Sequence, residues 1–357
     1  MTKVTRVGVD LAKNVFHVHG VDSKGRKLWQ KKLTRSKWVD QVCEKLVPGG
    51  EIGMEACASA HHWAREFGRR GFQVKLIAAQ FVKPFVKSNK NDSVDAEAIS
   101  EAMSRPSMRF VTPKTIGQQD IQAMHRIRSE LVSHRTAKAN QIRGLVGEYG
   151  IVAPIGINQL RRAIPCWLED ADNGLTELFR ELLMELWSDL RQLDDRVSEL
   201  DNRLTEQAKA NPVSQKLLQI KGVGVLTATA LTVALGDGSA FRNGRDFAVS
   251  LGLTPAQHST GGKPKLLGIS KRGDAYLRKL LVHGARSAVL VSKNRDDVLS
   301  RWIQKLSARK HANVVTVALA NKMARMAWAL VAKDANYDPQ RAAGPQITVD
   351  PMHTVAC

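Results

Sequence analysis

The chain has 357 residues, with 54 Lys or Arg against 34 Asp or Glu and a formal net charge of +20. This surplus favours a polyanionic partner, either nucleic acid or an anionic membrane, and the length allows two or three domains. A membrane is disfavoured, because no run of 18 apolar residues occurs and even the segment from Val314 to Ala332 carries Lys322 and Arg325. The four cysteines form no CxxC pair, so neither a zinc site nor a disulfide framework is indicated.

Residues 1–115 alternate between strand and helix signals. Apolar segments separated by polar turns or by Gly and Pro predict strands and amphipathic helices in turn. We expect three strands first, at Val4–Val9, Val15–Val21 and Arg26–Leu33. A helix from Ser36 to Leu46 should follow, ended by Pro48-Gly49-Gly50, and then a strand that ends at Glu55. The remaining predicted elements are a helix over 61–70, a strand at Phe72–Ile77 and a helix that starts near Ser93. This order predicts an α/β domain with the RNase H-like (RuvC-like) fold.

Residues 116–212 are predicted to be mainly helical. One long helix runs from Ile116 to about Tyr149, and a loop with Pro154 and Pro165 follows it. Apolar residues then recur at alternating steps of three and four, at Leu183, Leu186, Leu190, Leu193, Val197, Leu200 and Leu204. This heptad pattern predicts a coiled coil, which can pair with the preceding helix, with a partner subunit or with both. The alternative is an ordinary amphipathic helix of a bundle.

Pro212 marks the next boundary, and residues 213–333 are predicted to form a compact, mostly helical domain, with a loose tail over 334–357. The segment around Lys221-Gly222-Val223-Gly224 resembles a helix-hairpin-helix. Gly222 and Gly224 permit a tight turn, and the N–H groups of the following helix can meet a DNA phosphate. An ordinary helix–helix connection is the alternative.

Four carboxylates sit where an apolar segment ends or a helix begins: Asp10, Glu55, Asp92 and Asp95. Asp92 and Asp95 are three residues apart and so share one face of a helix. Converging carboxylates are what two-metal phosphoryl chemistry requires, so the four predict a Mg²⁺ site, with Mn²⁺ as a possible substitute. The alternative is that Asp10 and Asp92 are turn or cap residues and that Glu55 and Asp95 are simply solvated.

A second candidate site is the Gly-rich, hydroxyl-rich run from His258 to Arg278, which leads into a predicted helix. Its cations are suited to clamp phosphates: Lys263, Lys265, Lys271, Arg272 and Arg278. Ser259 in this setting is a plausible nucleophile toward phosphorus. The alternative is a loop that only positions phosphates, in which Ser259 donates a hydrogen bond.

Together these motifs resemble the transposases of the bridge-RNA-guided insertion-sequence family, in the one-ten and eleven-eleven group. The matching segments are Gly8-Val9-Asp10, Met54-Glu55, Asn91 to Ala96, Lys221 to Gly224 and Ser259 to Arg278. The resemblance implies a RuvC-like domain with a DEDD set at Asp10, Glu55, Asp92 and Asp95, and a C-terminal transposase domain with Ser259 as nucleophile. Thr260 and Ser270 are nearby hydroxyls that compete for that assignment.

On this resemblance the protein is a DNA recombinase that excises and inserts its own element through a phosphoserine intermediate. The implied partners are double-stranded DNA and a guide RNA, with the chain assembled as a dimer or tetramer in the bacterial cytoplasm, near the nucleoid. A RuvC-like junction nuclease, which hydrolyses DNA with the acids alone, is the main alternative. A non-catalytic nucleic-acid-binding protein would explain the charge but not the four acids.

Overall fold

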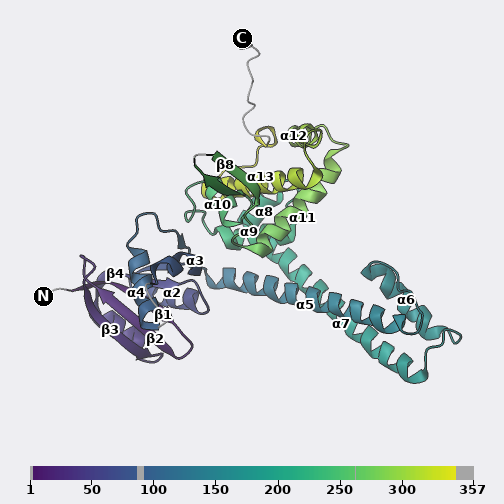
Figure 1. The fold of residues 1–357 in the computed structure, drawn as a ribbon, viewed down its shortest axis with the longest axis horizontal. Helices are drawn as coiled ribbons and strands as arrows, with labels where there is room; N and C mark the ends of the chain where they lie inside the picture. Colours follow the sequence, from purple (N-terminus) through teal and green to yellow (C-terminus); the bar gives the residue numbers. More distant parts are fainter. Residues whose placement is uncertain (1–2, 87–91, 262, 343–357) are drawn as a thin grey trace, which may run out of the picture. The chain divides into compact units, whose positions relative to one another are not determined.

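The computed structural model describes residues 3–86, 92–261 and 263–342 (Figure 1). The chain forms two compact units. The first comprises residues 1–117 with the short segment 236–240, and the second comprises residues 118–235 and 241–357. Each unit has its own clusters of buried apolar side chains. The finer division of the chain at residues 115 and 212 stays a prediction.

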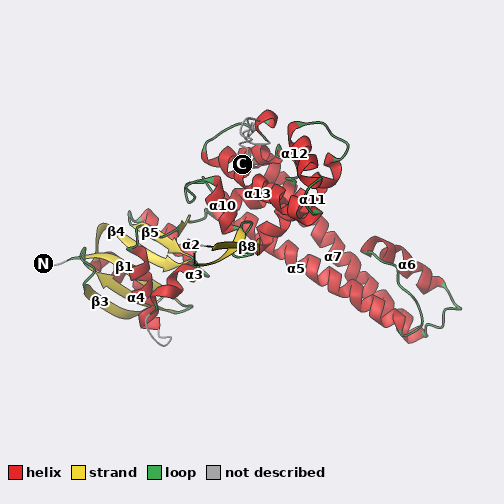
Figure 2. Cartoon of the chain, turned by 45° about the horizontal axis from the view of Figure 1, so that its top comes forward, coloured by secondary structure: helices red, strands yellow, loops and turns green. Residues whose placement is uncertain are grey.

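The first unit is built on a mixed six-stranded sheet. Its strands are β1 (Val4–Leu11), β2 (Val15–Val21), β3 (Lys27–Thr34), β4 (Leu46–Glu55), β5 (Gln73–Ile77) and β6 (Phe110–Val111). They lie in the order β3-β2-β1-β4-β5-β6, and β1, β4 and β5 run parallel to one another. The three leading antiparallel strands and the mixed sheet agree with the predicted RNase H-like arrangement (Figure 2).

Helices cover this sheet. They are α1 (Trp38–Lys45), α2 (Ala60–Arg69), α3 (Ala79–Val82), the short η1 (Lys83–Phe85) and α4 (Asp92–Met103). The largest apolar cluster joins β2 to α1 and α2 through aromatic rings, with Phe16 stacked on Trp38 at 4.6 Å between ring centroids and Trp63 edge-on to both. Alternation along a strand places His17 on the opposite face from Phe16. One face of the sheet therefore packs against the aromatic core, and α4 covers the other face with apolar residues of its own.

Three features of the first unit differ from the sequence prediction. Pro48-Gly49-Gly50 lies inside β4 instead of ahead of it. The pairing of β1 with β4 jumps from Val4 opposite Leu46 to Arg6 opposite Glu51, so this segment forms a bulge, which accommodates a proline that cannot donate to the ladder. The sequence analysis also missed the two-residue strand β6 and the single-turn helix α3, which are too short to show a period.

The second unit contains most of the helices. They are α5 (Ile116–Gly147, whose first turn belongs to the first unit), α6 (Ile157–Glu169), α7 (Glu177–Ala210), α8 (Pro212–Leu218), α9 (Val225–Leu235), α10 (Gly244–Ser250), α11 (Ala275–Ser292), α12 (Val298–Ser307), α13 (Ala312–Ala332) and the short η2 (Pro339–Arg341). A hairpin of β7 (Pro255–Thr260) and β8 (Lys263–Ile269) interrupts them.

The two long helices α5 and α7 pack side by side in antiparallel directions (Figures 1 and 2). Ion pairs mark the register: Arg128 with Asp201, Arg135 with Asp194 and Lys138 with Asp189. As the number of the cation rises, that of its carboxylate partner falls, which is the signature of an antiparallel pair. The predicted coiled-coil segment therefore pairs with the preceding helix of the same chain. A pairing with a partner subunit stays a prediction.

The heptad residues of α7 divide into two sets. Leu183, Leu190, Val197 and Leu204 are buried, whereas Leu186, Leu193 and Leu200 are only partly buried. The buried set repeats every seven residues, and Leu183, Leu190 and Leu204 pack with apolar residues of α5, α6 and α9. One of the two apolar stripes of the heptad is thus buried by contacts within the same chain.

Two predictions about loops are wrong. Pro165 lies within α6 and not in a loop, because Leu160 and Ile164 on the same helix are fully buried against α5 and α7, and this burial outweighs the hydrogen bond that proline removes. The predicted tail also begins too early, since Tyr337 and Ala342 pack on the helical core. Residues 343–357 lie outside the described part of the chain.

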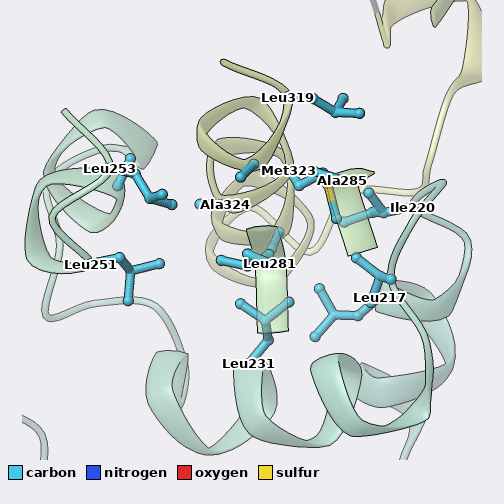
Figure 3. Close-up of a cluster of buried hydrophobic side chains, with 14 of the residues drawn as sticks. Leu217, Ile220, Leu231, Leu251, Leu253, Leu281, Ala285, Leu319, Met323 and Ala324 are labelled. Atoms are coloured by element: carbon cyan, nitrogen blue, oxygen red, sulfur yellow. The ribbon is translucent and has the colours of Figure 1, made fainter. Parts of the chain in front are cut away.

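The largest core of the protein joins α8–α13. Leu231, Leu281 and Met323 meet at its centre, each fully buried (Figure 3). The helix α13 is long and apolar enough to cross a membrane by composition alone. Its buried residues, including Leu319 and Met323, are part of this core, so its apolar character is explained by packing.

A buried histidine ties the α5–α7 pair to this helical core. His125 of α5 has Nδ1 2.9 Å from the Tyr276 hydroxyl and Nε2 3.0 Å from Thr229 Oγ1. Because the Thr229 hydroxyl donates to the Val225 carbonyl, it accepts from Nε2–H, and Tyr276 donates to Nδ1. Burial, and next the nearby Arg128, lower the pKa of His125 to about 4, which keeps the imidazole neutral in this tautomer at neutral pH.

Candidate active site

Two glycines let α4 lie directly on the sheet of the first unit. Gly8 of β1 and Gly53 of β4 are opposite each other in the parallel pairing. A Cβ on Gly8 would come within 2.3 Å of the Ala96 carbonyl oxygen, and one on Gly53 would collide with the Met103 side chain. Only residues without a side chain permit this approach. The paired glycines therefore fix the position of α4, and with it the position of the acids in its first turn.

The four predicted acids come from the three elements that meet here. Asp10 lies two residues beyond Gly8 on β1, and Glu55 two residues beyond Gly53 on β4, so both side chains point to the face that α4 covers. Asp92 and Asp95 occupy the first turn of α4. The sequence predicted this convergence from the positions of the acids at the ends of strands and the start of a helix, and the glycine pair explains how the three elements come so close.

The acids act on one another electrostatically. Burial, followed by repulsion from Asp95 and Asp92, raises the pKa of Asp10, although His17 opposes the shift. Burial and then Asp95 raise the pKa of Glu55 as well. Within the described residues, no three His, Cys, Asp or Glu side chains are gathered closely enough to hold a metal ion. The four carboxylates thus share one electrostatic environment without forming a closed coordination shell.

This environment fits a divalent cation by its chemistry. Its donors are carboxylate oxygens, which Mg²⁺ and Mn²⁺ prefer, and their charge is unbalanced where they face one another. A cation would relieve the repulsion that raises the pKa of Asp10. We therefore keep Asp10, Glu55, Asp92 and Asp95 together as the candidate metal site.

Sequence reasoning missed two neighbours of this site. His17 lies directly opposite Asp10 in the antiparallel pairing of β1 and β2. Cys57 follows Glu55 by two residues, and desolvation together with the charges of Glu55 and Asp10 raises the pKa of its thiol. The register of the first hairpin was the signal that could have located His17. Cys57 had no signal, because a lone cysteine carries no spacing pattern.

The run that holds Ser259 is a β-hairpin, where the sequence suggested an irregular loop. Ser259 lies on β7 opposite Pro264, and His258 lies opposite Lys265. Alternation places Ser259 and His258 on opposite faces of the hairpin, so His258 is not its base. The Ser259 hydroxyl is exposed and accepts a hydrogen bond of 2.7 Å from the Gln257 side-chain amide.

The predicted phosphate-binding cations have different surroundings. Lys265 is exposed and lines a small pocket with His258, Thr260 and Leu267. Lys271 and Arg272 are exposed on the turn that leads to α11, whereas the Arg278 guanidinium donates to the Leu251 carbonyl at 2.8 Å. The side chain of Lys263 and all of Gly262 lie outside the described part. Arg278 therefore has a structural role in addition to the one predicted for it.

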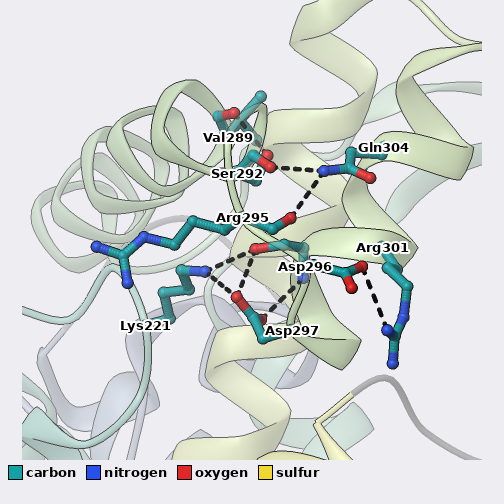
Figure 4. A network of polar contacts seen from close by, with 9 residues as sticks. Lys221, Val289, Ser292, Arg295, Asp296, Asp297, Arg301 and Gln304 are labelled. Atoms are coloured by element: carbon teal, nitrogen blue, oxygen red, sulfur yellow. Dashed lines mark hydrogen bonds and ion pairs between the residues drawn. The ribbon is translucent and has the colours of Figure 1, made fainter.

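The helix-hairpin-helix-like turn is held by contacts inside the protein. Gly222 has φ +90°, and a Cβ there would lie 2.7 Å from the Gly284 carbonyl oxygen of α11. Lys221 donates to both Asp297 and Ser300 at 2.7 Å, at the start of α12 (Figure 4). Nothing lies within 4 Å of a Cβ on Gly224, so space does not require glycine there. Phosphate binding by Gly222 and Gly224 stays a prediction.

Both halves of the chain match transposase families. Residues 7–151 match the DEDD transposase family of the IS110 type, and residues 214–299 match the family described as "Transposase IS116/IS110/IS902 family". The chain is 47% identical to a "Probable family 20 transposase" of Pseudomonas aeruginosa, over 94% of this chain and 99% of that protein. The chain belongs to the IS110/IS116/IS902 family of transposases.

Other relatives of this transposase carry the same description. It is 43% identical to the "Transposase for insertion sequence element IS1111A" of Coxiella burnetii, over 94% of this chain and 92% of that protein. It is also 43% identical to the transposase of element IS1328 of Yersinia enterocolitica. The protein is therefore an enzyme of DNA transposition, and DNA is its partner. The first matched segment contains all four acids, and the second contains Ser259.

Proposed function

We propose that this transposase cuts and rejoins DNA through a phosphoserine intermediate formed on Ser259, with Asp10, Glu55, Asp92 and Asp95 holding Mg²⁺. The observation that carries the metal part is the mutual repulsion of carboxylates from β1, β4 and α4 in a chain whose net charge is +20. The serine part is supported by the exposure of Ser259 on a hairpin next to exposed cations. Bound Mg²⁺ would supply Lewis-acid stabilisation of the charged phosphoryl oxygens.

The proposed chemistry conserves the phosphodiester bond energy. The Ser259 Oγ–H attacks phosphorus, an O–P bond forms, the bond to one deoxyribose oxygen breaks, and that oxygen takes up the proton. In the second step a hydroxyl of the receiving strand attacks the phosphoserine, which restores the serine. The Gln257 amide donates to the Ser259 oxygen, and the exposed Lys271 and Arg272 attract the phosphate, whereas Lys265 shares the opposite face of the hairpin with His258.

We further propose that an RNA from the element selects donor and target by base pairing, and that several copies of the chain assemble to act on two DNA duplexes. The net charge of +20 suits two nucleic-acid partners, and no helix in the described part stands out as a reader of DNA sequence. The partly exposed Leu193 and Leu200 of α7 offer an edge for assembly.

The test is a denaturing gel of the full chain with element-end DNA and Mg²⁺. Ser259→Ala should remove the covalent protein–DNA species and slow cleavage on the order of 10³-fold or more, because the nucleophile is lost. DNA affinity should stay nearly intact, because many phosphate contacts dominate binding. Ser270→Ala, which removes a partly buried hydroxyl beyond the end of β8, is the matched control and should retain the adduct.

Mass spectrometry of a trapped adduct assigns the residue. A phosphate on Thr260 or Ser270 would refute the role of Ser259 and leave the covalent mechanism standing. Cleavage that depends on Asp10 and gives no adduct would refute the phosphoserine step and favour the junction nuclease, in which the carboxylates act alone.

A further inference from the structure

A groove on the second unit gathers cations that belong to neither candidate site. It is lined by the start of α10, by α13 and by residues 341 and 342, and its volume is about 470 Å³. Arg245 of α10, Lys322 and Arg325 of α13, and Arg341 of η2 all line it. Neither the motif analysis nor the proposed chemistry uses any of these four side chains.

The groove exists because α10 begins with glycine. A Cβ on Gly244 would come within 2.9 Å of the Arg325 carbonyl oxygen and 3.0 Å of its Cα. Gly244 therefore lets the first turn of α10 rest on the backbone of α13, which brings Arg245 and Arg325 to the same groove. The Trp328 indole, which donates to the Phe241 carbonyl at 3.2 Å, and Met326 supply its apolar wall.

The charges in the groove are not balanced by its own lining. Among the described lining residues there is no carboxylate. Arg245 and Arg325 are exposed, and neither makes an ion pair with a described residue, whereas Arg242, three residues before Arg245, pairs with Asp246 at 2.9 Å. Arg341 pairs with Asp338 at 3.3 Å but is 90% exposed, so it also remains accessible.

The surroundings of Lys322 show that the concentration of positive charge in the groove is electrostatically unfavourable. Its ammonium group lies 5.0 Å from the centre of the Trp302 ring. Burial, and then the neighbouring Arg325, lower the pKa of Lys322. Like charges held together in this way are unfavourable until an anion lies between them.

We infer that this groove binds the phosphodiester backbone of a nucleic acid. Arginine side chains present several donors in a fixed fork that matches phosphate oxygens, and here two of them converge without a competing carboxylate in the groove. The net charge of +20 and the action of the protein on DNA favour nucleic acid over an acidic peptide as the occupant. The site is independent of Ser259 chemistry and extends the nucleic-acid contact beyond the hairpin.

The experiment measures binding of the full chain to a DNA duplex and, separately, to a structured RNA, at several salt concentrations with EDTA present so that no cleavage occurs. The variant is Arg245→Gln with Arg325→Gln. Each lost phosphate contact should lower the slope of log Kd against log salt by about 1, so the pair should lower it by about 2. Arg245→Lys with Arg325→Lys should keep most of the slope, because the charges remain.

The matched control is Arg242→Gln with Arg301→Gln, which removes the same charge from two exposed arginines that are ion-paired with Asp246 and Asp296. This control should change the slope of log Kd against log salt clearly less than Arg245→Gln with Arg325→Gln does. A loss of affinity for only DNA, or for only RNA, supports the site and identifies which nucleic acid the groove binds. The inference would be overturned if the control pair lowered the slope as much as Arg245→Gln with Arg325→Gln. It would also be overturned if Arg245→Gln with Arg325→Gln left nucleic-acid binding unchanged but abolished binding of polyglutamate, an acidic peptide.

Discussion

Asp10 is a residue whose charge the fold disfavours. Burial and the neighbouring Asp95 and Asp92 raise its pKa above the ordinary value of 3.8. A raised carboxyl pKa means that the folded state holds the proton more tightly than the unfolded state, so stability from this group is lost as the pH rises from below 3.8 through the raised pKa. At neutral pH without metal, Asp10 therefore weakens the fold.

We predict that Asp10→Asn stabilises the protein at neutral pH in EDTA, by an amount on the order of 1 kcal/mol, because the amide removes a charge that burial and the neighbouring carboxylates disfavour. The gain should vanish well below pH 3.8, where the wild-type carboxyl is also protonated. Thermal melts followed by circular dichroism measure this. Mg²⁺ should raise the Tm of the wild type more than that of the variant.

Asp40→Asn is the control for this prediction, since Asp40 is exposed in the first turn of α1 and the change is chemically identical. It should give no gain, because a carboxylate at a helix N-terminus is favourable. A stabilised Asp40→Asn, or an Asp10→Asn protein less stable than the wild type in EDTA, would show that Asp10 is not under repulsion.

Among the elements, those with a long or regular pattern could be predicted from sequence. The strands β1 to β5, the helix α5 and the heptad of α7 all follow from apolar periodicity over five residues or more. The acids of the candidate site followed from their positions at the ends of these elements. The convergence was predictable, whereas its cause, the contact of Gly8 and Gly53 with α4, depends on a tertiary approach that no local pattern encodes.

The sequence predictions were wrong at Pro48, at Pro165 and in the segment 255–260 that contains Ser259, and these errors have one physical origin. Proline and glycine are local signals for a break, but each segment is held by pairing or packing with another element. β1 accommodates the bulge at Pro48, the burial of Leu160 and Ile164 holds α6, and pairing with β8 turns residues 255–260 into a strand. Tertiary contacts override the local preference in the first two segments, and the hairpin pairing with the next strand does so in the third.

The α5–α7 pair allows a direct test at this scale. Leu190 is fully buried in the stripe that faces the same chain. We predict that Leu190→Ala lowers the free energy of unfolding by about 2–5 kcal/mol, measured by urea titration, while light scattering shows an unchanged mass. Leu193→Ala, on the partly exposed edge of the helix, is the control and should cost clearly less. A lower mass for Leu190→Ala would mean that this stripe joins subunits.

At the scale of the whole molecule, the acids and the serine belong to separate compact units with separate cores. Asp297 of the second unit is stabilised by charge pairing, whereas Asp10 of the first unit is under charge repulsion. Although burial works to raise it, hydrogen bonds from Lys221 and Ser300 hold the pKa of Asp297 well below its ordinary value of 3.8. This pairing stabilises the fold above pH 3.8 and is lost as the pH falls toward the lowered pKa.

We predict that calorimetry of the full chain at neutral pH resolves two unfolding transitions, because each unit buries its own apolar residues. Asp10→Asn should raise the temperature of one transition only. Lys221→Met should lower the temperature of the other, since Asp297 loses a hydrogen-bonded cation, which typically costs about 1–3 kcal/mol. Acidification should narrow the difference between Lys221→Met and wild type as the pH falls from 3.8 toward the lowered pKa of Asp297. A single transition whose temperature changes in both variants would contradict this prediction. It would show that the unit with the acids and the unit with the serine unfold together.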